Sequence, residues 1–261
     1  MRALSIAATG MQAQQLNVDV ISHNIANMNT TGYKRQRAEF QDMLYQNQER
    51  PGSTSSASGA VLPLGVQLGV GVSADAVGRV TSQGGITVTD NSYDLAINGR
   101  GYFQITLPSG QTAYTRAGNL AIDADGTLVT ADGFVVEPSI TIPAEALDTQ
   151  ITRDGIVEVK IDGQAAPTQV GQLELATFVN AAGLEAIGDN LFLETPASGS
   201  PNTSTPGSEG FGQIIQGALE ISNVNAVEEI SALIVAQRAY EMNSRVITAA
   251  DEMLQAATQL R

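Results

Sequence analysis

Apolar side chains recur every seven residues at the start of the chain. A second row follows the first with an offset of three residues, which is the spacing of a coiled-coil seam. The first row is Leu4, Met11, Val18 and Ile25, and the second is Ala7, Gln14, Ile21 and Met28. The pattern predicts a helix of about 25 residues, some 38 Å long, with one face buried.

The last part of the chain repeats this spacing with three rows. The rows are Leu233, Tyr240, Ile247 and Leu254; Ala236, Asn243, Ala250 and Ala257; and Ala232, Ala239, Val246, Met253 and Leu260. A helix from Val224 to Leu260 would measure about 55 Å, whereas a compact chain of this length is only about 47 Å across. We therefore expect this helix to protrude, and both termini to become fully ordered only among neighbouring copies. Asn243, a polar residue in the seam, is expected to fix the register between neighbours.

Between the two helical ends the pattern changes to strands and turns. Residues 47–72 begin as a Ser/Gly/Pro-rich loop and continue with alternating apolar positions. From about 80 to 195, strand-like runs are separated by the turn pairs Asn98-Gly99, Asp125-Gly126, Asp132-Gly133 and Asp162-Gly163 and by Pro108-Ser109-Gly110. Another loop-like segment covers 194–212.

These patterns predict an α+β fold with an all-β domain inserted between two terminal helices. The helices meet as a coiled-coil-like inner domain, and extended linkers join them to the β domain. The expected segments are an N-terminal inner helix (1–33), an extended linker with a long loop or strand (34–79), a β-rich outer domain (80–195), a return linker (196–222) and a C-terminal inner helix (223–261).

Charge and composition exclude several partners. The net charge of -14 argues against nucleic acid, because phosphate binding requires a cationic surface. Lys34, Arg35 and Arg37 form the one basic cluster, which we interpret as a solvated helix end. Cysteine is absent, so disulfides and thiolate metal sites are excluded. No stretch reaches the ~18 apolar residues of a membrane span, so no direct membrane insertion is expected, and the N-terminus does not resemble a cleaved signal peptide.

The residues offer little for catalysis. The single histidine, His23, lies on a helix face rich in Asn and Ser, and a packed or solvated histidine is the favoured interpretation. The segment "DADGT" (123–127) resembles a calcium loop but lacks its spacing and has Phe134 where the ligating glutamate would stand, so a β-turn is expected. We therefore expect no catalytic residue, metal or cofactor.

The two ends together resemble the axial proteins of the bacterial flagellum, the family of rod and hook subunits. The matching segments are "ISHNIANMNTTGYKRQRAEFQDMLY" (21–45), "DLAINGRGYFQI", "YTRAGNL", "DGTLVTADGF", "QVGQLELATF" and "SNVNAVEEISALIVAQRAYEMNSRVITAADEMLQAATQL" (222–260). Within the family the chain looks most like the distal rod protein. Its length suits a single β domain, and the extension over Gln48–Val72 resembles the linker associated in that family with a straight, stiff tube.

The resemblance implies roles for particular residues. Asn24, Asn27, Asn29, Thr30, Gly32 and Tyr33 would end the inner helix and turn the chain outward, and Asn223 and Asn225 would mark the return into the C-terminal helix. The implied subunit interface consists of Leu4, Met11, Val18, Ile21, Ile25, Asn27, Asn29, Thr30, Gly32, Tyr33, Asn223, Asn225, Leu233, Gln237, Arg238, Tyr240, Asn243, Ile247 and Leu254. The implied rod-specific linker residues are Gln48, Pro51, Gly52, Pro63, Leu64 and Gly65.

The resemblance also implies a function, location and partners. A helical tube of identical subunits would transmit torque from the motor to the hook around an export channel. The protein would cross the periplasm in the basal body, exported without a cleaved signal peptide. Implied partners are proximal rod proteins, hook subunits or the hook junction, periplasmic and outer-membrane ring proteins, and a rod cap. A hook or proximal rod subunit is the first alternative, and a secreted β-rich adhesin or hydrolase the second.

Overall fold

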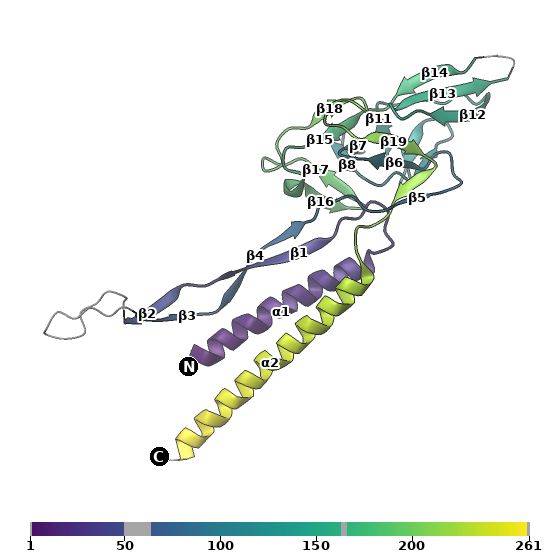
Figure 1. Cartoon of the computed structure of the whole chain (residues 1–261). Coiled ribbons are helices and arrows are strands. Elements are labelled where there is room, and N and C mark those ends of the chain that lie inside the picture. The colour runs from purple at the N-terminus through teal and green to yellow at the C-terminus, as the bar shows by residue number, and fades with distance from the viewer. Residues whose placement is uncertain (1, 50–63, 163–165, 260–261) are drawn as a thin grey trace. The chain divides into compact units, whose positions relative to one another are not determined.

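The computed structural model describes residues 2–49, 64–162 and 166–259. The α+β prediction is confirmed: α1 (Arg2–Ala26) and α2 (Ala226–Gln259) flank a middle region of strands (Figure 1). The chain divides into two compact units. The helical unit comprises Met1–Ile25, Gln36–Gly78 and Asn225–Arg261, and the β unit comprises Ala26–Arg35 and Arg79–Val224.

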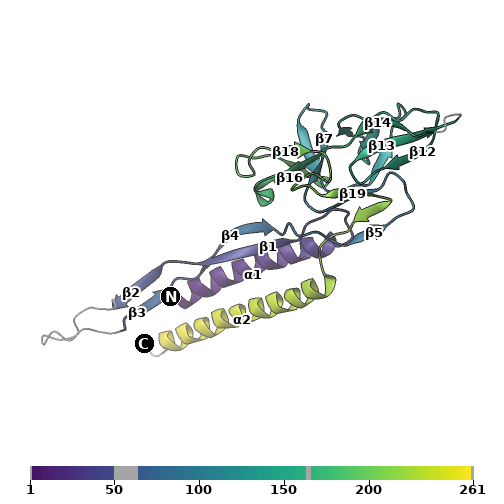
Figure 2. The ribbon, with the colours of Figure 1, turned by 45° about the horizontal axis from the view of Figure 1, so that its top comes forward.

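The helical unit contains a β ribbon as well as the two helices. In the ribbon β1 (Gln36–Asp42) pairs with β4 (Val72–Arg79), and β2 (Tyr45–Glu49) pairs antiparallel with β3 (Val66–Gly69). The helix α1 lies between this ribbon and α2 (Figure 2). Thr9 contacts the ribbon, where its Oγ1 accepts a hydrogen bond from the backbone N–H of Val72 at 3.4 Å. The ribbon explains why α1 buries Ala13 and Val20, which lie outside both predicted rows.

The two helices run antiparallel in a defined register. Asn24 donates a hydrogen bond to the Glu229 carboxylate at 3.1 Å. A Cβ added to Gly10 would lie 2.9 Å from the Asn243 amide nitrogen, so these residues also face each other. Gly10 lies fourteen residues before Asn24, and Asn243 lies fourteen residues after Glu229. Fourteen residues are two heptads, so both contacts lie on one seam. The structure thus places Asn243 against α1 of its own chain.

Local chemistry explains where α2 begins. The Asn225 side chain accepts a hydrogen bond from the Val227 backbone N–H at 3.1 Å, which is the geometry of an N-cap. Its amide also donates to Glu228 at 3.3 Å. Glu228 and Glu229 occupy the first turn, where acidic side chains complement the positive end of the helix dipole.

The β unit is built from short strands joined by tight turns. Their bounds are β5 (Ile86–Val88), β6 (Leu95–Asn98), β7 (Tyr102–Thr106), β8 (Thr112–Thr115), β9 (Leu120–Ile122), β10 (Leu128–Thr130), β11 (Val135–Glu137), β12 (Ala146–Ile151), β13 (Ile156–Ile161), β14 (Thr168–Gln172), β15 (Leu175–Thr177), β16 (Glu185–Gly188), β17 (Leu191–Leu193), β18 (Asn202–Ser204), β19 (Gln213–Gln216) and β20 (Ala218–Glu220). A short 3-10 helix, η1, covers Ala181–Gly183.

The main sheet follows the order β16-β17-β8-β7-β11-β10-β9, with β15 pairing to both β7 and β18. A smaller sheet has the order β12-β13-β14, and β6 pairs with β19 as β5 pairs with β20. Apolar side chains from these strands and from the adjoining loops form a large buried core: Leu95, Ile97, Phe103, Ile105, Ala113, Leu120, Leu128, Val136, Ile140, Ile151, Val157, Leu173, Leu175, Leu191 and Ile214.

Most predicted turns join paired strands. The strands β7 and β8 form a hairpin around residues 108–110, and β9 and β10 form another around Asp125-Gly126. The segment 123–127 is a β-turn, as expected, because the Gly126 N–H donates to the Asp123 carbonyl at 2.9 Å. Asn98-Gly99 differs: it connects β6 to β7, but β6 pairs with β19. The strands β13 and β14, on either side of the predicted Asp162-Gly163 turn, do pair, but Gly163 lies outside the described residues.

Candidate assembly interface

One face of α2 exposes a continuous apolar stripe. We call this set the outer stripe: Val235, Ala239, Met242, Val246, Ala249 and Met253. The spacing alternates between four and three residues, so all six lie on one side of the helix. The large members remain open to solvent: Val235 is 68% exposed, Met242 62%, Val246 46% and Met253 62%. The predicted third row contributes Ala239, Val246 and Met253 to this stripe.

The face of α2 next to the outer stripe, about 100° around the helix, holds the buried seam. Ala236 and Ala250 are buried, and Leu233, Asn243, Ile247 and Leu254 are partly buried. These residues belong to the first two predicted rows, but two members of those rows face solvent: Tyr240 is 44% exposed and Ala257 is exposed. A further patch of Val227, Ile230 and Ile234 lies on the first turns of α2 and is 50–73% exposed. The helix thus shows apolar surface that the described part of its own chain leaves exposed.

The predicted interface residues of α1 are partly covered within the chain. Ile21 is buried, and Leu4, Met11, Val18 and Ile25 are partly buried. On α2, Gln237 and Arg238 face solvent, and Arg238 donates a hydrogen bond to Glu241 at 3.0 Å. The more exposed side chains of α2, rather than those of α1, therefore offer the larger area to a neighbour.

Asn24 connects three elements of the helical unit. Its amide donates to the Gln36 carbonyl at 2.8 Å, and its side-chain oxygen accepts from the Gln36 N–H at 2.9 Å. The Asn24 side chain thereby pairs with the backbone N–H and carbonyl of Gln36 at the start of β1, as the backbone of a neighbouring strand would. The same amide reaches Glu229 of α2. This buried asparagine was predicted to end the helix, and the structure gives it the additional contacts to β1 and α2.

The segment after α1 turns within the β unit. Thr30 donates to Asn27 through both its backbone and its hydroxyl, and the Tyr33 N–H donates to the Thr30 carbonyl at 3.3 Å. Asn29 is exposed. Gly32 is buried with φ of +69° and donates to the Glu220 carbonyl at 2.8 Å. A side chain at Gly32 would meet backbone atoms at 2.8 Å, so the turn requires glycine.

Asn223 joins the outgoing and returning segments of the β unit. Its side-chain oxygen accepts from the Arg35 N–H at 2.6 Å. Its amide donates to the carbonyls of Val80 and Ser82, each at 3.0 Å. One side chain therefore links three backbone segments, at residues 35, 80–82 and 223.

A buried ion cluster lies beside this junction. The Glu220 carboxylate accepts from the Lys34 ammonium at 2.6 Å and from the Arg116 guanidinium at 2.6 Å. The Gly84 N–H donates to the same carboxylate at 2.9 Å. Arg116 also donates to the carbonyls of Gly101 and Gly99 at 2.6 and 2.7 Å. The three charges are almost completely buried and hydrogen bonded, so each depends on the others.

This cluster corrects the prediction made for Lys34. The ion pair between Glu220 and Arg116 was not predicted at all. Lys34 was expected on a solvated helix end, but it is only 4% exposed because its ammonium is paired inside the β unit. Arg37 does face solvent, beside Glu39. The pairing of Glu220 with Arg116 could not be read from the sequence, because the two residues are 104 positions apart. Arg116 lies in "YTRAGNL", a segment identified by resemblance without a role for its arginine.

Burial and charge act against each other in the cluster. Burial alone would raise the pKa of Glu220, but the charges of Arg116 and Lys34 and the hydrogen bonds from Lys34 and Gly84 hold this pKa below its usual value. Burial lowers the pKa of Lys34, and Glu220 opposes that effect. The carboxylate is therefore ionised at neutral pH.

The lowered pKa of Glu220 makes stability depend on pH. Its contribution is complete above the ordinary pKa of 4.5 and is lost as the pH falls through the lower folded-state pKa. We expect the stability difference between the wild type and Glu220→Gln to be large at pH 7 and to shrink below pH 4.5. Urea unfolding at several pH values measures this difference, and a difference that stays constant down to pH 2.5 would contradict the assignment.

Of the six predicted linker residues, Gln48, Leu64 and Gly65 are among the described residues and lie at or beside the ribbon strands β2 and β3. Gln48 is an exposed residue of β2, Leu64 is 82% exposed and Gly65 is partly buried. Pro51, Gly52 and Pro63 lie outside the described residues. Leu44, Tyr45, Val66 and Leu68 around this region are also exposed.

The described residues give little support for a catalytic site, a metal site or a membrane-spanning helix. His23 lies on an exposed face of α1. Over residues 2–49, 64–162 and 166–259, no group of His, Cys, Asp and Glu side chains could hold a metal ion. In the same residues, neither helix combines the length and the apolar character needed to cross a membrane.

Three family models match the chain. The flagellar basal-body rod protein model matches residues 4–34, the flagellar hook protein FlgE/F/G D1 domain matches 96–159, and the FlgEFG C-terminal model matches 215–260. A flagellar basal-body rod protein FlgG from Caulobacter vibrioides is 62% identical over 261 residues, all of both chains. FlgG from Agrobacterium fabrum is 54% identical over 97% of each chain, and FlgG from Bacillus subtilis is 40% identical over 100% of this chain and 99% of the relative.

A helix pair with exposed apolar surface, flanking an inserted β unit, is typical of a structural subunit that assembles with other protein chains. The chain belongs to the FlgE/F/G family of flagellar rod and hook proteins. It is a structural subunit of the flagellar rod and is located in the flagellar basal body. The resemblance found in the sequence is therefore confirmed, including its closer likeness to the distal rod protein FlgG.

Proposed function

We propose that this chain polymerises with copies of itself into the helical tube of the distal rod, and that the tube transmits motor torque to the hook around an export channel. The observation that carries the proposal is the outer stripe of α2. Its four large apolar side chains are 46–68% exposed in a single chain. Apolar stripes of this length are seldom left in water and mark contact with another protein.

The lengths of the helices support contact between copies. At ~1.5 Å per residue α1 spans about 38 Å and α2 about 51 Å. In the observed register Arg2 lies opposite residue 251, so the last turns of α2, including Met253, extend past the start of α1. A neighbouring chain could cover both these turns and the outer stripe. A head-to-tail contact that does not close on itself produces a helical polymer.

Polymerisation of the purified chain tests the proposal. We expect filaments or short tubes by electron microscopy at high concentration, and an increase in helical circular dichroism on assembly. Full helicity in a dilute chain and the absence of polymer at every concentration would together contradict the proposal. The subunit has no catalytic role in this proposal.

A deletion tests the assignment to the distal rod. We propose that the linker around Gln48–Leu64 keeps the tube straight, so removing it should produce rods that are curved or altered in length, as measured by microscopy of basal bodies. Rods unchanged in shape and length would favour a hook or proximal rod subunit instead. The proposed partners are proximal rod proteins, hook or junction subunits, ring proteins of the periplasm and outer membrane, and a rod cap.

A further inference from the structure

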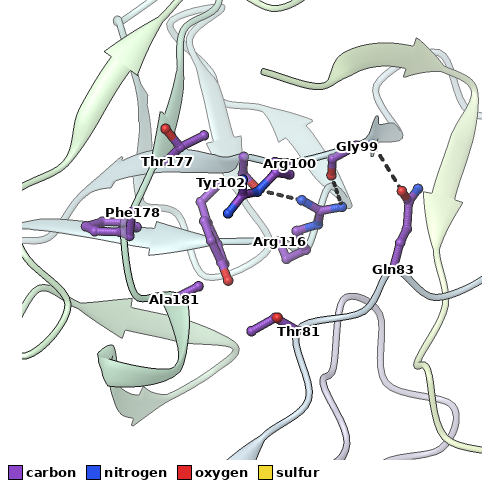
Figure 3. Close-up of a pocket in the computed structure, with 10 residues that line it drawn as sticks. Thr81, Gln83, Gly99, Arg100, Tyr102, Arg116, Thr177, Phe178 and Ala181 are labelled. Atoms are coloured by element: carbon purple, nitrogen blue, oxygen red, sulfur yellow. Dashed lines mark hydrogen bonds between the residues drawn. The ribbon is translucent and has the colours of Figure 1, made fainter. Parts of the chain in front are cut away.

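A small cavity opens in the β unit beside the buried ion cluster. Its volume is about 230 Å³, and Figure 3 shows the side chains that line it. Small-molecule sites usually measure about 300–1,000 Å³, so this cavity is too small for most such ligands and suits a single side chain. The lining residues are Thr81, Gln83, Gly99, Arg100, Gly101, Tyr102, Arg116, Thr177, Phe178 and Ala181.

Tyr102 presents an unused hydroxyl to this cavity. The residue is only 7% exposed, and its ring packs edge-on against Phe178 and Phe192 with centroids 6.0 Å apart. Figure 3 shows the hydroxyl extending toward Thr81 and Ala181. The Tyr102 hydroxyl has no hydrogen-bond partner among residues 2–49, 64–162 and 166–259. No buried side-chain oxygen in the described residues lacks a partner, so this hydroxyl is open to the cavity and can donate to a group that enters it.

Two arginines, Arg100 and Arg116, also line the cavity, and Arg116 is paired with Glu220. Arg100 lines the cavity with an exposed guanidinium that forms no ion pair within the described part of the chain. Burial raises the pKa of Tyr102, while Arg116 and Arg79 lie near enough to oppose that effect. Gln83 is already engaged, since it donates to the Ile97 carbonyl and accepts from the Gly99 N–H. Among the remaining donors of the lining, the Arg100 guanidinium and the Tyr102 hydroxyl can together bind a carboxylate.

The rest of the β unit supplies the complementary charge. It contains seventeen Asp and Glu against seven Lys and Arg, a net charge of -10. Lys34 and Arg116 are buried, so few basic side chains remain at its surface. A second copy therefore offers many carboxylates to the exposed guanidinium of Arg100. Electrostatic complementarity of this kind selects the partner and the register of a contact.

We propose that this cavity is a socket for a carboxylate side chain from the β unit of a second copy, held by Arg100 and Tyr102. This inference rests on the proposed self-assembly and adds a contact between β units to the contacts of the helices. One copy contributes the socket and the next contributes the acid, so the contact is head to tail. Such a contact repeats along a helical polymer without closing.

Matched charge substitutions test the socket. Arg100→Glu and Lys160→Glu change the charge equally, but Lys160 is an exposed residue of β13 that does not line the cavity. We expect Arg100→Glu to raise the critical concentration for polymerisation about tenfold or more, and Lys160→Glu to change it by less than about twofold. Tyr102→Phe keeps the ring and removes only the donor, and should raise the critical concentration about three- to tenfold. Equal effects of Arg100→Glu and Lys160→Glu would overturn the proposal.

Zero-length coupling separates this proposal from the proposed function. The amine introduced by Arg100→Lys can be joined by carbodiimide only to a carboxylate in direct contact. Mass spectrometry should find a bond between position 100 and an acidic residue in 79–224 of another chain. Coupling is read at the highest protein concentration whether or not filaments form. Filaments without this bond would overturn the socket alone, and the bond without filaments would support the socket while contradicting assembly into a tube. If neither filaments nor the bond were found, both proposals would be contradicted.

Discussion

The double substitution Met242→Ala and Val246→Ala is expected to raise the critical concentration for polymerisation about a hundredfold. Both side chains belong to the outer stripe and are 62% and 46% exposed in the single chain. Burying one such side chain contributes about 1.5–3 kcal/mol, and each 1.4 kcal/mol changes an association constant about tenfold. Alanine favours the helix, so the fold of α2 should be preserved. Sedimentation of polymer across a concentration series measures the effect.

A control on the same turns isolates the apolar contribution. Glu241→Ala with Arg245→Ala also truncates two exposed side chains of α2 and leaves the net charge unchanged. We expect this variant to polymerise within about threefold of the wild type, because exposed charges contribute little. If the two double variants polymerise equally well, the outer stripe is not the contact surface.

Glu220→Gln is expected to destabilise the β unit by about 3–5 kcal/mol. The substitution keeps the size of the side chain but removes the negative charge between Lys34 and Arg116, both of which are buried. A buried charge left without its partner is costly, and that cost is larger than the net contribution of the intact pair. Urea unfolding at pH 7, followed by fluorescence or circular dichroism, gives the free energy of unfolding.

The same change at an exposed site provides the reference. Glu185 is an exposed residue of β16, and Glu185→Gln should alter stability by less than about 0.5 kcal/mol. A loss of similar size in both variants would show that the charge of Glu220 is not specifically required. A loss confined to Glu220→Gln would support the ion cluster as the link between the segment after α1 and strand β20.

The periodicity of apolar residues was sufficient to predict the two helices and the buried side of α2. Leu233, Ala236, Ile247 and Ala250 follow the heptad spacing and do lie on the buried side of α2, because a regular helix converts sequence spacing directly into a face. The hairpins β7–β8 and β9–β10 could also be predicted from the sequence, since their turn residues lie between strands that are adjacent in the chain. Local geometry determines both features, so no distant contact has to be known.

Contacts between distant segments could be decided only by the tertiary structure. Asn98-Gly99 has the sequence of a hairpin turn, yet β6 pairs with β19, more than a hundred residues later. Lys34 looked like a solvated cation until the fold placed Glu220 beside it. In each case the residue type limits the possible partners, but a partner far along the chain is selected by packing of the whole unit.

The sequence by itself therefore determined the two terminal helices, the β region between them and the membership of the rod and hook family. The reason is that helical spacing, turn chemistry and long terminal motifs are properties of continuous segments. The tertiary structure decided that α1 lies between α2 and a β ribbon, that Asn243 faces Gly10 of the same chain, and that three buried charges meet at Glu220. These features depend on which side chains become neighbours after folding, and that information is spread over the entire chain.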